Sequence, residues 1–258
     1  QTWIALLQEI FALLILTGIG LAVWQRYALR PQRFKGSSGT DAIVIYGLVI
    51  AVVITMLLEF ASNILAGGDS SAPWRPLSGA LAAGVAQLGV TPALAAAGRT
   101  LFSWMHIAAI LAFLVYIPGS KHRHIFTAIP NIFFRSLKPK GVLPAPPSDR
   151  GQIGVSKIEH FSWKHMLDLY SCTECGRCQS VCPAYAAGQP LSPKLLIMDL
   201  RDHLMEASSG KPTGPLIGGA IQEATLWACT TCRACMDVCP LHIEHVPKIV
   251  DMRRQLVE

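Results

Sequence analysis

Eight cysteines form two copies of one spaced run near the C-terminal end of the chain. The runs are CTECGRCQSVCP at 172–183 and CTTCRACMDVCP at 229–240, and each reads C-x2-C-x2-C-x3-C-P. This spacing is typical of paired [4Fe–4S] clusters, where three thiolates of a run bind one cluster and the fourth binds its neighbour. The chain therefore carries the ligands for electron transfer. The spacing predicts a first cluster on Cys172, Cys175, Cys178 and Cys239, and a second on Cys229, Cys232, Cys235 and Cys182.

Zinc and disulfide bonds are the alternatives for these cysteines. Zinc sites usually present paired C-x2-C halves, not two runs of four that end in Cys-Pro. Disulfides are disfavoured because thiols two residues apart suit a metal site, and the two runs use all eight cysteines. We rank both alternatives below a pair of iron–sulfur clusters.

The N-terminal half of the chain carries an apolar excess. Hydrophobic residues make up 52% of the sequence and charged residues 15%, which is too apolar for an ordinary soluble domain. Stretches at 3–25, 42–66 and 101–118 hold at most one charged residue each. Each is long enough, or nearly so, to cross about 30 Å of hydrocarbon as a helix. A secretory signal peptide would come once and begin with basic residues, so three membrane spans are predicted.

Basic loops indicate how often the chain crosses the membrane. The segment 26–35 carries four basic residues and no acid, and the segment 121–140 carries five and no acid. The positive-inside rule puts both segments on the cytoplasmic side, which requires three spans in total. The Ala- and Gly-rich stretch at 76–98 is then not a fourth span. Residues 67–99 are instead expected to form short surface helices at the outer face.

Composition divides the chain into three parts. We expect a membrane domain over 1–128, a Pro-rich linker over 129–154 and a cytoplasmic cluster domain over 155–258. Within the last part, helices are predicted at 161–170, 192–204 and 245–257. The fold class is therefore all-α, a transmembrane bundle followed by a helical di-cluster domain. The net charge of +6 is explained by membrane-flanking residues and requires no nucleic acid.

Two histidines have the spacing of axial haem ligands. His106 and His124 are 18 residues apart, which in one helix returns to the same face after about 27 Å. That separation matches the hydrocarbon thickness and suits one ligand for each of two b-type haems. The alternative is that His124, like His122, is an interfacial base. His242 and His245 follow the last Cys-Pro, where an ordinary surface position is favoured over hydrogen bonding to a cluster.

Two acids within the apolar stretches are candidates for proton handling. Glu9 and Glu59 both lie toward the outer face on the predicted topology. An acid at membrane depth suggests function, and quinone reduction moves protons together with electrons. The alternative is that each acid bonds to a neighbouring helix near a helix end. The interpretation as quinone residues is the less favoured one.

The whole chain resembles known electron-transfer families. LILTGIGLAVWQRYALRPQRFKGSSGTDAIVIYGLVI and WMHIAAILAFLVYIPGSKHRH are similar to helices of respiratory nitrate reductase gamma subunits, which are dihaem cytochromes b. This likeness implies that His106 and His124 bind haem. SCTECGRCQSVCPAYAAGQPLSPKLLIMDLRDHL and WACTTCRACMDVCPLHIEH resemble heterodisulfide reductase-type iron–sulfur oxidoreductases. The distance between the runs resembles the di-cluster domain of succinate dehydrogenase iron–sulfur subunits. The combination resembles bacterial membrane-bound Fe–S oxidoreductases, including electron-transfer-flavoprotein:menaquinone oxidoreductases.

The resemblance implies a membrane-bound electron conduit in the bacterial inner membrane. Electrons would pass from an electron-transfer flavoprotein through two [4Fe–4S] clusters and b haems to menaquinone. The alternatives are a quinol-oxidising donor subunit of a heterodisulfide or sulfur reductase, and a haem-free membrane anchor. The family's opposing haem ligands lie on a helix before residue 1, and its cysteine-rich CCG domains follow the di-cluster domain. The chain starts on Gln, not Met, so we expect the native protein to begin further upstream.

Overall fold

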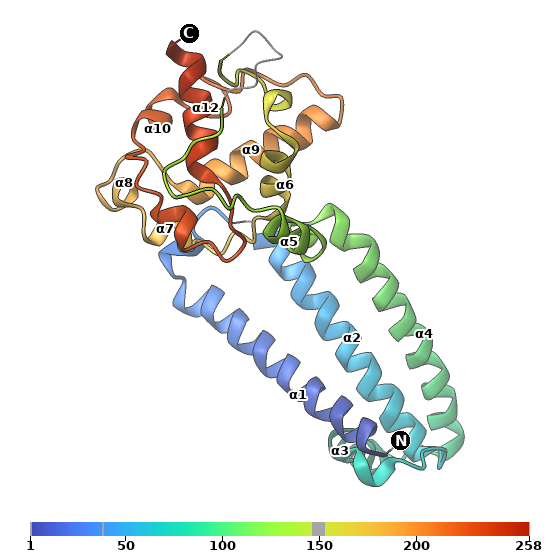
Figure 1. Ribbon diagram of the computed structural model, residues 1–258. Helices are drawn as coiled ribbons and strands as arrows, with labels where there is room; N and C mark the ends of the chain where they lie inside the picture. The colour runs from blue at the N-terminus through green and yellow to red at the C-terminus, as the bar shows by residue number, and fades with distance from the viewer. Residues whose placement is uncertain (1, 38, 146–152, 258) are drawn as a thin grey trace. The chain divides into compact units, whose positions relative to one another are not determined.

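The computed structural model describes residues 2–37, 39–145 and 153–257, and within these residues it contains helices and no strand (Figure 1). The all-α prediction is therefore confirmed. The chain forms two compact units. Unit 1 comprises Gln1–Pro31 and Ser38–Ser120, and unit 2 comprises Gln32–Ser37 and Lys121–Glu258. The short segment between the first two long helices thus belongs to the unit that carries the cysteines.

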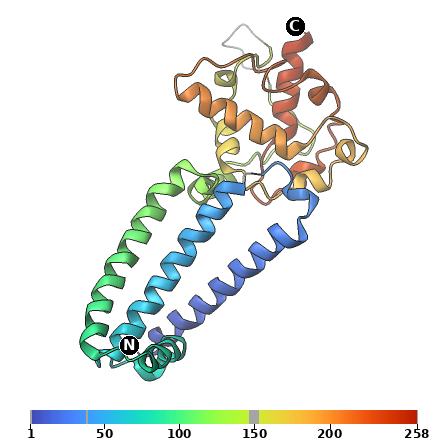
Figure 2. The same cartoon turned by 180° about the vertical axis from the view of Figure 1, so that it is seen from behind.

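Unit 1 contains three long apolar helices, α1 (Thr2–Trp24), α2 (Gly39–Leu65) and α4 (Pro92–Tyr116). Helix α2 runs alongside α4, as both views show (Figures 1 and 2). By length and composition, the candidate membrane spans are Thr2–Leu29, Gly39–Leu65 and Pro92–Gly119. They include short helical extensions of α1 at Gln25–Leu29 and of α4 at Ile117–Gly119. The three predicted spans are confirmed as candidates, and most of their apolar surface is open to lipid or to other helices.

A short 3-10 turn (Ala72–Trp74) and the 12-residue helix α3 (Pro76–Gln87) follow α2. This helix is too short to cross a membrane. The third span begins at Pro92, earlier than the predicted 101. The Thr91 hydroxyl caps its start by accepting a hydrogen bond from the Leu94 N–H at 3.3 Å, and proline is favoured at the first helical position. Part of the predicted 67–99 surface segment therefore belongs to α4.

The continuous helix assumed between His106 and His124 is interrupted. Helix α4 ends at Tyr116, and two 3-10 turns follow at Ile117–Gly119 and Lys121–Arg123. Pro118 lies in the first turn, where its missing N–H and its ring favour the end of an α-helix. His124 then begins a separate helix, α5 (His124–Phe133), in unit 2. The 27 Å separation assumed for one straight helix therefore does not apply.

Unit 2 repeats one arrangement around the two cysteine runs. Helix α6 (Trp163–Ser171) leads into the first run, whose end forms α7 (Arg177–Ser180) and α8 (Pro183–Ala186) before α9 (Pro193–Ser208). Helix α10 (Glu223–Trp227) leads into the second run, which contains α11 (Ala234–Asp237) and is followed by α12 (His245–Val257). The helices α7 and α11 contact each other. The three helices predicted in this part of the chain are confirmed within a few residues.

Serine caps explain two of these helix starts. The side chains of Ser162 and Ser192 accept hydrogen bonds from the N–H groups of His165 and Leu195, both at 3.2 Å. An apolar core that includes Leu169, Leu200 and Ile249 joins α6, α9 and α12. Of the predicted linker, residues 129–133 lie in α5, and residues 146–152 lie outside the described part. The compositional domain boundaries stay a prediction.

Candidate iron–sulfur and haem sites

Two cavities in unit 2 are each lined by four cysteines. We call the cavity lined by Cys172, Cys175, Cys178 and Cys239 the first cysteine pocket. The second cysteine pocket is lined by Cys182, Cys229, Cys232 and Cys235. Each pocket takes three cysteines from one run and the fourth from the other run. The structure thus brings together the two sets of cysteines that the spacing predicts as cluster ligands.

The two cysteine loops share an unusual backbone conformation at equivalent positions. Glu174 in the first loop and Thr231 in the second both have φ of 55°. Two residues later, Gly176 has φ of 74° and Arg233 has φ of 66°. Non-glycine residues adopt this left-handed conformation at a cost, so it persists where a site requires it. The N–H groups of Glu174 and Thr231 donate to the Sγ atoms of Cys172 and Cys229, which stabilises thiolate ligands.

Each pocket offers four thiols, which is the ligand set of one [4Fe–4S] cluster. A tetrahedral zinc ion needs its ligands within about 2.3 Å of one point. Among the described residues, no group of three or more His, Cys, Asp or Glu side chains converges in that way. All eight cysteines are free of disulfide bonds. Burial raises the pKa of Cys172 and of Cys235 to about 12, so binding of iron to their thiolates must release protons.

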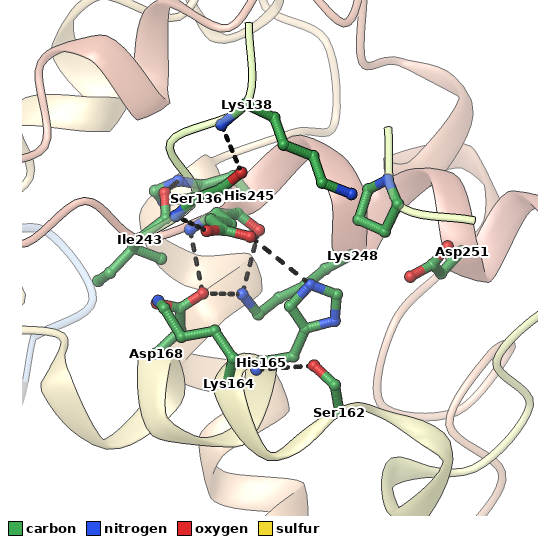
Figure 3. A network of polar contacts seen from close by, with 12 residues as sticks. Ser136, Lys138, Ser162, Lys164, His165, Asp168, Ile243, His245, Lys248 and Asp251 are labelled. Carbon is green, nitrogen blue, oxygen red and sulfur yellow. Dashed lines mark hydrogen bonds and ion pairs between the residues drawn. The ribbon is translucent and has the colours of Figure 1, made fainter. Parts of the chain in front are cut away.

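A buried network of charged side chains lies beside the last Cys-Pro loop (Figure 3). Asp168 on α6 accepts hydrogen bonds from Lys164 Nζ at 2.6 Å, from the Glu244 N–H at 3.1 Å and from Lys248 Nζ on α12. Asp168 and Lys248 are both fully buried. Lys164 also donates to Asn131 Oδ1 at 3.0 Å, and Asn131 donates to the Leu241 carbonyl at 2.9 Å. The network therefore ties α5, α6 and α12 to the loop that carries Cys239.

Charge and burial in this network shift several pKa values. Burial opposes ionisation of Asp168, but the two lysines outweigh it and lower the pKa of Asp168 to about 2. Burial, reinforced by Lys248, lowers the pKa of His165 to about 3. Burial lowers the pKa of Lys248 as well. At neutral pH, Asp168 is therefore ionised and His165 is neutral.

His245 is buried, which corrects the favoured surface position. It lines the first cysteine pocket, and its Nδ1 lies 3.0 Å from the Ile243 carbonyl oxygen. His242 is half-buried, and its Nε2 accepts a hydrogen bond from Arg135 at 2.8 Å. These two histidines therefore have different surroundings, although they are three residues apart.

His106 on α4 is oriented by α2. Its Nδ1 lies 3.0 Å from the Val52 carbonyl oxygen and 3.1 Å from Thr55 Oγ1. A carbonyl can only accept, so Nδ1 carries the proton and Nε2 is the nitrogen left to bind a metal. His124 has an equivalent bond in unit 2, from Nδ1 to the Lys121 carbonyl at 2.8 Å. Both histidines thus have the backbone bond typical of metal-bound histidine, while their role as haem ligands stays a prediction.

Glu9 on α1 is fully buried and caps helix α3. Its carboxylate accepts hydrogen bonds from the Leu77 N–H at 2.8 Å, the Ser78 N–H at 3.0 Å and the Ser78 hydroxyl at 2.6 Å. A carboxylate is favoured at a helix N-terminus, so this geometry gives Glu9 a structural role. Glu59 is half-buried near the end of α2. A role of either acid in quinone chemistry stays a prediction.

Two lysines that none of the sequence patterns above predicts to be buried, Lys194 and Lys248, are fully buried. Each follows a proline at the start of a helix, as Pro193–Lys194 in α9 and Pro247–Lys248 in α12, and each comes after a Cys-Pro. Lysine is rarely buried unless it is paired. The repeated Pro-Lys pair after both runs is the signal that could have found them. Lys194 also lines the first cysteine pocket.

Comparison with known proteins agrees with an iron–sulfur domain in unit 2. Residues 171–243 match the 4Fe-4S dicluster domain family. A relative from Bacillus subtilis (strain 168), named iron-sulfur-binding oxidoreductase FadF, is 34% identical over 97% of this chain and 41% of its own length. A Syntrophomonas wolfei protein named EtfAB:quinone oxidoreductase is 31% identical over 96% of this chain and 40% of its own length. A Chromohalobacter salexigens protein named membrane-anchored ferredoxin is 45% identical over 40% of this chain and 19% of its own length.

The chain spans about two fifths of the length of the first two relatives. No solved structure matches it. The two relatives that match nearly the whole chain are named as oxidoreductases. The expected resemblance to membrane-bound iron–sulfur oxidoreductases is thereby confirmed, with a 4Fe-4S dicluster domain at residues 171–243 behind three candidate membrane helices.

Proposed function

We propose that the protein transfers electrons between a cytoplasmic flavoprotein and the menaquinone pool. The observation that carries this proposal is the pair of crossed cysteine pockets in unit 2. Two [4Fe–4S] clusters bound there would each carry one electron. Because each run would supply one ligand to the other run's cluster, the two clusters would be held close together. In this reading the chain's own residues bind the clusters, shield them and adjust their potentials.

The exposure of the cysteines supports an order of transfer. Each pocket has two buried cysteines, but Cys232 in the second pocket is exposed, whereas the most accessible cysteines of the first pocket, Cys175 and Cys239, are only partly exposed. A redox protein in solution therefore has a shorter approach to the second cluster. Electrons would enter there and leave from the first cluster toward the membrane. The name of one relative, EtfAB:quinone oxidoreductase, supports an electron-transfer flavoprotein as the donor and a quinone as the acceptor.

The membrane part of the proposal involves b-type haem. His106 and His124 would each supply Nε2 to one haem, because Nδ1 of each bonds to a backbone carbonyl. Neither α1 nor α2 contains a histidine, so the opposing ligands would come from a helix that is not among these residues. Menaquinone would be reduced near the outer face, with Glu9 or Glu59 as a proton donor.

We place the protein in the bacterial inner membrane with unit 2 in the cytoplasm. The basic segments at 26–35 and 121–140 support this orientation, as does the reducing environment that thiolate-bound clusters require. The first two relatives are more than twice as long as this chain. We include in the proposal a CCG-type region, either in the same chain or in a partner chain.

A reduced-minus-oxidised visible spectrum of the complete protein from native membranes tests the proposal. We expect about two b haems for each pair of [4Fe–4S] clusters, and loss of haem absorbance in His106→Ala. His122→Ala, which alters a neighbouring histidine without a predicted ligand role, serves as the matched control. Clusters without haem would leave an iron–sulfur domain on a membrane anchor. Reduction of the clusters by a reduced flavoprotein in a stopped-flow experiment tests the donor separately.

A further inference from the structure

The segment Gln32–Ser37, which we call the cover segment, belongs to unit 2, and its hydrogen bonds there include three from one buried lysine. Lys194 Nζ donates hydrogen bonds to the Arg33 carbonyl at 3.0 Å, the Lys35 carbonyl at 2.5 Å and the Ser37 hydroxyl at 3.3 Å. An ammonium group has three N–H donors, and these three oxygens match them. The contacts join residues about 160 positions apart in the sequence. Two of the three acceptors are backbone carbonyls, so the contact does not depend on the side chains of Arg33 and Lys35.

Lys194 occupies a position that local helix chemistry disfavours. It is the second residue of α9, where Ser192 caps the helix and the partial positive charge of the helix N-terminus opposes a cation. Complete burial of its side chain adds a desolvation cost. Lys194 also lines the first cysteine pocket together with Cys172, Cys175 and Cys239. A lysine at this position is therefore explained by its contacts with the cover segment and by its place in the pocket wall, not by the stability of α9.

The first cysteine loop is shaped to receive the cover segment, and the second loop is not. A Cβ atom added at Gly176 would lie 2.4 Å from the Arg33 carbonyl oxygen and 2.8 Å from Arg33 Cβ, closer than real contacts allow. Short helix α7, which follows Gly176, contacts the 3-10 turn Gln32–Phe34. The equivalent residue of the second run is Arg233, which carries a full side chain. The close approach of the cover segment is therefore specific to the first run.

We propose that Lys194 is a positioning residue that fastens the cover segment over the first cluster and raises the reduction potential of that cluster. Reduction adds one negative charge to the cluster, and a fixed cation in a buried site stabilises the reduced form more than the oxidised form. The acid in the same loop, Glu174, forms an ion pair with Arg201 at 2.9 Å, so its charge is balanced locally.

This arrangement gives the first cluster a defined place in the electron path. The cover segment lies in sequence between the two candidate spans Thr2–Leu29 and Gly39–Leu65. A cluster covered by this segment is therefore the one whose cover is joined along the chain to two candidate spans. The inference rests on the proposed function, because it requires clusters in both pockets, and it adds a residue that determines the potential of one of them.

An EPR-monitored redox titration of the complete protein tests the electrostatic part. For Lys194→Met we expect the reduction equilibrium of one cluster to weaken about tenfold, which is about 59 mV for one electron, while the other midpoint stays unchanged. Lys194→Arg, which keeps the charge, should retain most of the wild-type potential. Lys211→Met, at an exposed lysine of the same unit, is the control for a lost charge and should move neither midpoint.

A pair of glycine variants tests the cover without altering Lys194. Gly176 and Gly188 both have φ of 74°, but an added Cβ at Gly188 meets nothing within 4 Å. Alanine at either site causes the same backbone strain, and only Gly176→Ala displaces the cover segment. We expect a chelator such as EDTA, with ferricyanide, to destroy the first cluster several-fold faster in Gly176→Ala than in Gly188→Ala. This comparison remains informative if Lys194→Met fails to fold.

Three outcomes would overturn the inference. They are equal midpoints in wild type and Lys194→Met, an equal shift of both clusters, and equal cluster loss in the two glycine variants. A wild-type protein without two cluster signals would instead refute the proposed function. The two failures are therefore distinguishable within one set of samples.

Discussion

Replacing Asp168 by Asn removes the negative charge that pairs with both Lys164 and Lys248 in the buried network. The pKa of Asp168 is lowered from 3.8 to about 2. At about 1.36 kcal/mol per pH unit, this difference of about 1.8 units corresponds to about 2.4 kcal/mol of stability at neutral pH. Removing one partner of a buried ion pair typically costs about 3–5 kcal/mol. Because burial already lowers the pKa of Lys248, that lysine can lose its proton and limit the cost. We expect Asp168→Asn to destabilise unit 2 by about 2–4 kcal/mol.

The matched control is a second Asp–Lys pair in the same unit. Asp237 and Lys140 are 2.8 Å apart, but both side chains are largely exposed. Solvent screens such a pair, so Asp237→Asn should leave stability nearly unchanged. The double variant Asp168→Asn/Lys248→Met removes both charges of the buried pair. It should recover part of the loss, because the uncompensated buried cation is gone.

Urea denaturation of the detergent-solubilised complete protein at pH 7.5, followed by far-UV circular dichroism, measures these differences. The pH dependence provides a further check. Since the pKa of Asp168 is lowered in the folded state, its contribution is fully present above about pH 4 and is lost as pH falls through about 2. Equal urea midpoints for Asp168→Asn, Asp237→Asn and wild type would refute the claim that this network stabilises the fold.

Three more predictions concern the pockets and their surroundings. Between pH 6.5 and about 3, the contribution of His165 to the free energy of unfolding should fall with decreasing pH by up to about 1.36 kcal/mol per unit, because His165 is neutral in the folded state and charged in the unfolded state. In His165→Gln, urea midpoints measured at pH 7.5, 6.5 and 5.5 should therefore depend less on pH than in wild type. Cys239→Ser should alter the EPR signal of the first cluster and Cys182→Ser that of the second; a change confined to the cluster of the mutated run would refute the crossed arrangement. Glu9→Gln should lower the thermal midpoint of unit 1 more than Glu59→Gln, because only Glu9 accepts three hydrogen bonds from α3.

Local sequence patterns were sufficient to predict the elements. The apolar stretches predicted the three candidate spans, because membrane helices depend on the composition of one continuous segment. The helix starts at Ser162 and Ser192 are also local features, because an N-cap hydrogen bond joins residues within four positions of each other. The start of α4 at Pro92 lies before the predicted stretch 101–118, because Arg99 interrupts the run of uncharged residues. The Thr91–Pro92 cap signal was the stronger one.

Contacts between distant segments could not be predicted in this way. Pro118 ends α4, so the even spacing of His106 and His124 along one helix had no structural counterpart. The burial of Lys194 and Lys248 could not be predicted either, because the sequence shows that a residue is charged but not which groups surround it. Lys194 meets carbonyl groups about 160 residues earlier, and carbonyl groups leave no trace in side-chain patterns.

The two cysteine runs keep the same ligands and differ in what surrounds them. At the position after the second cysteine, the first run has Gly176 and accepts the cover segment, whereas the second has Arg233 and does not. After the Cys-Pro, Lys194 bonds to that segment, whereas Lys248 bonds to the carboxylate of Asp168. Cluster potentials depend on nearby charge, hydrogen bonds and solvent exposure. A repeated ligand pattern in unequal surroundings should therefore give two clusters of unequal potential, which is the condition for electrons to move in one direction between them.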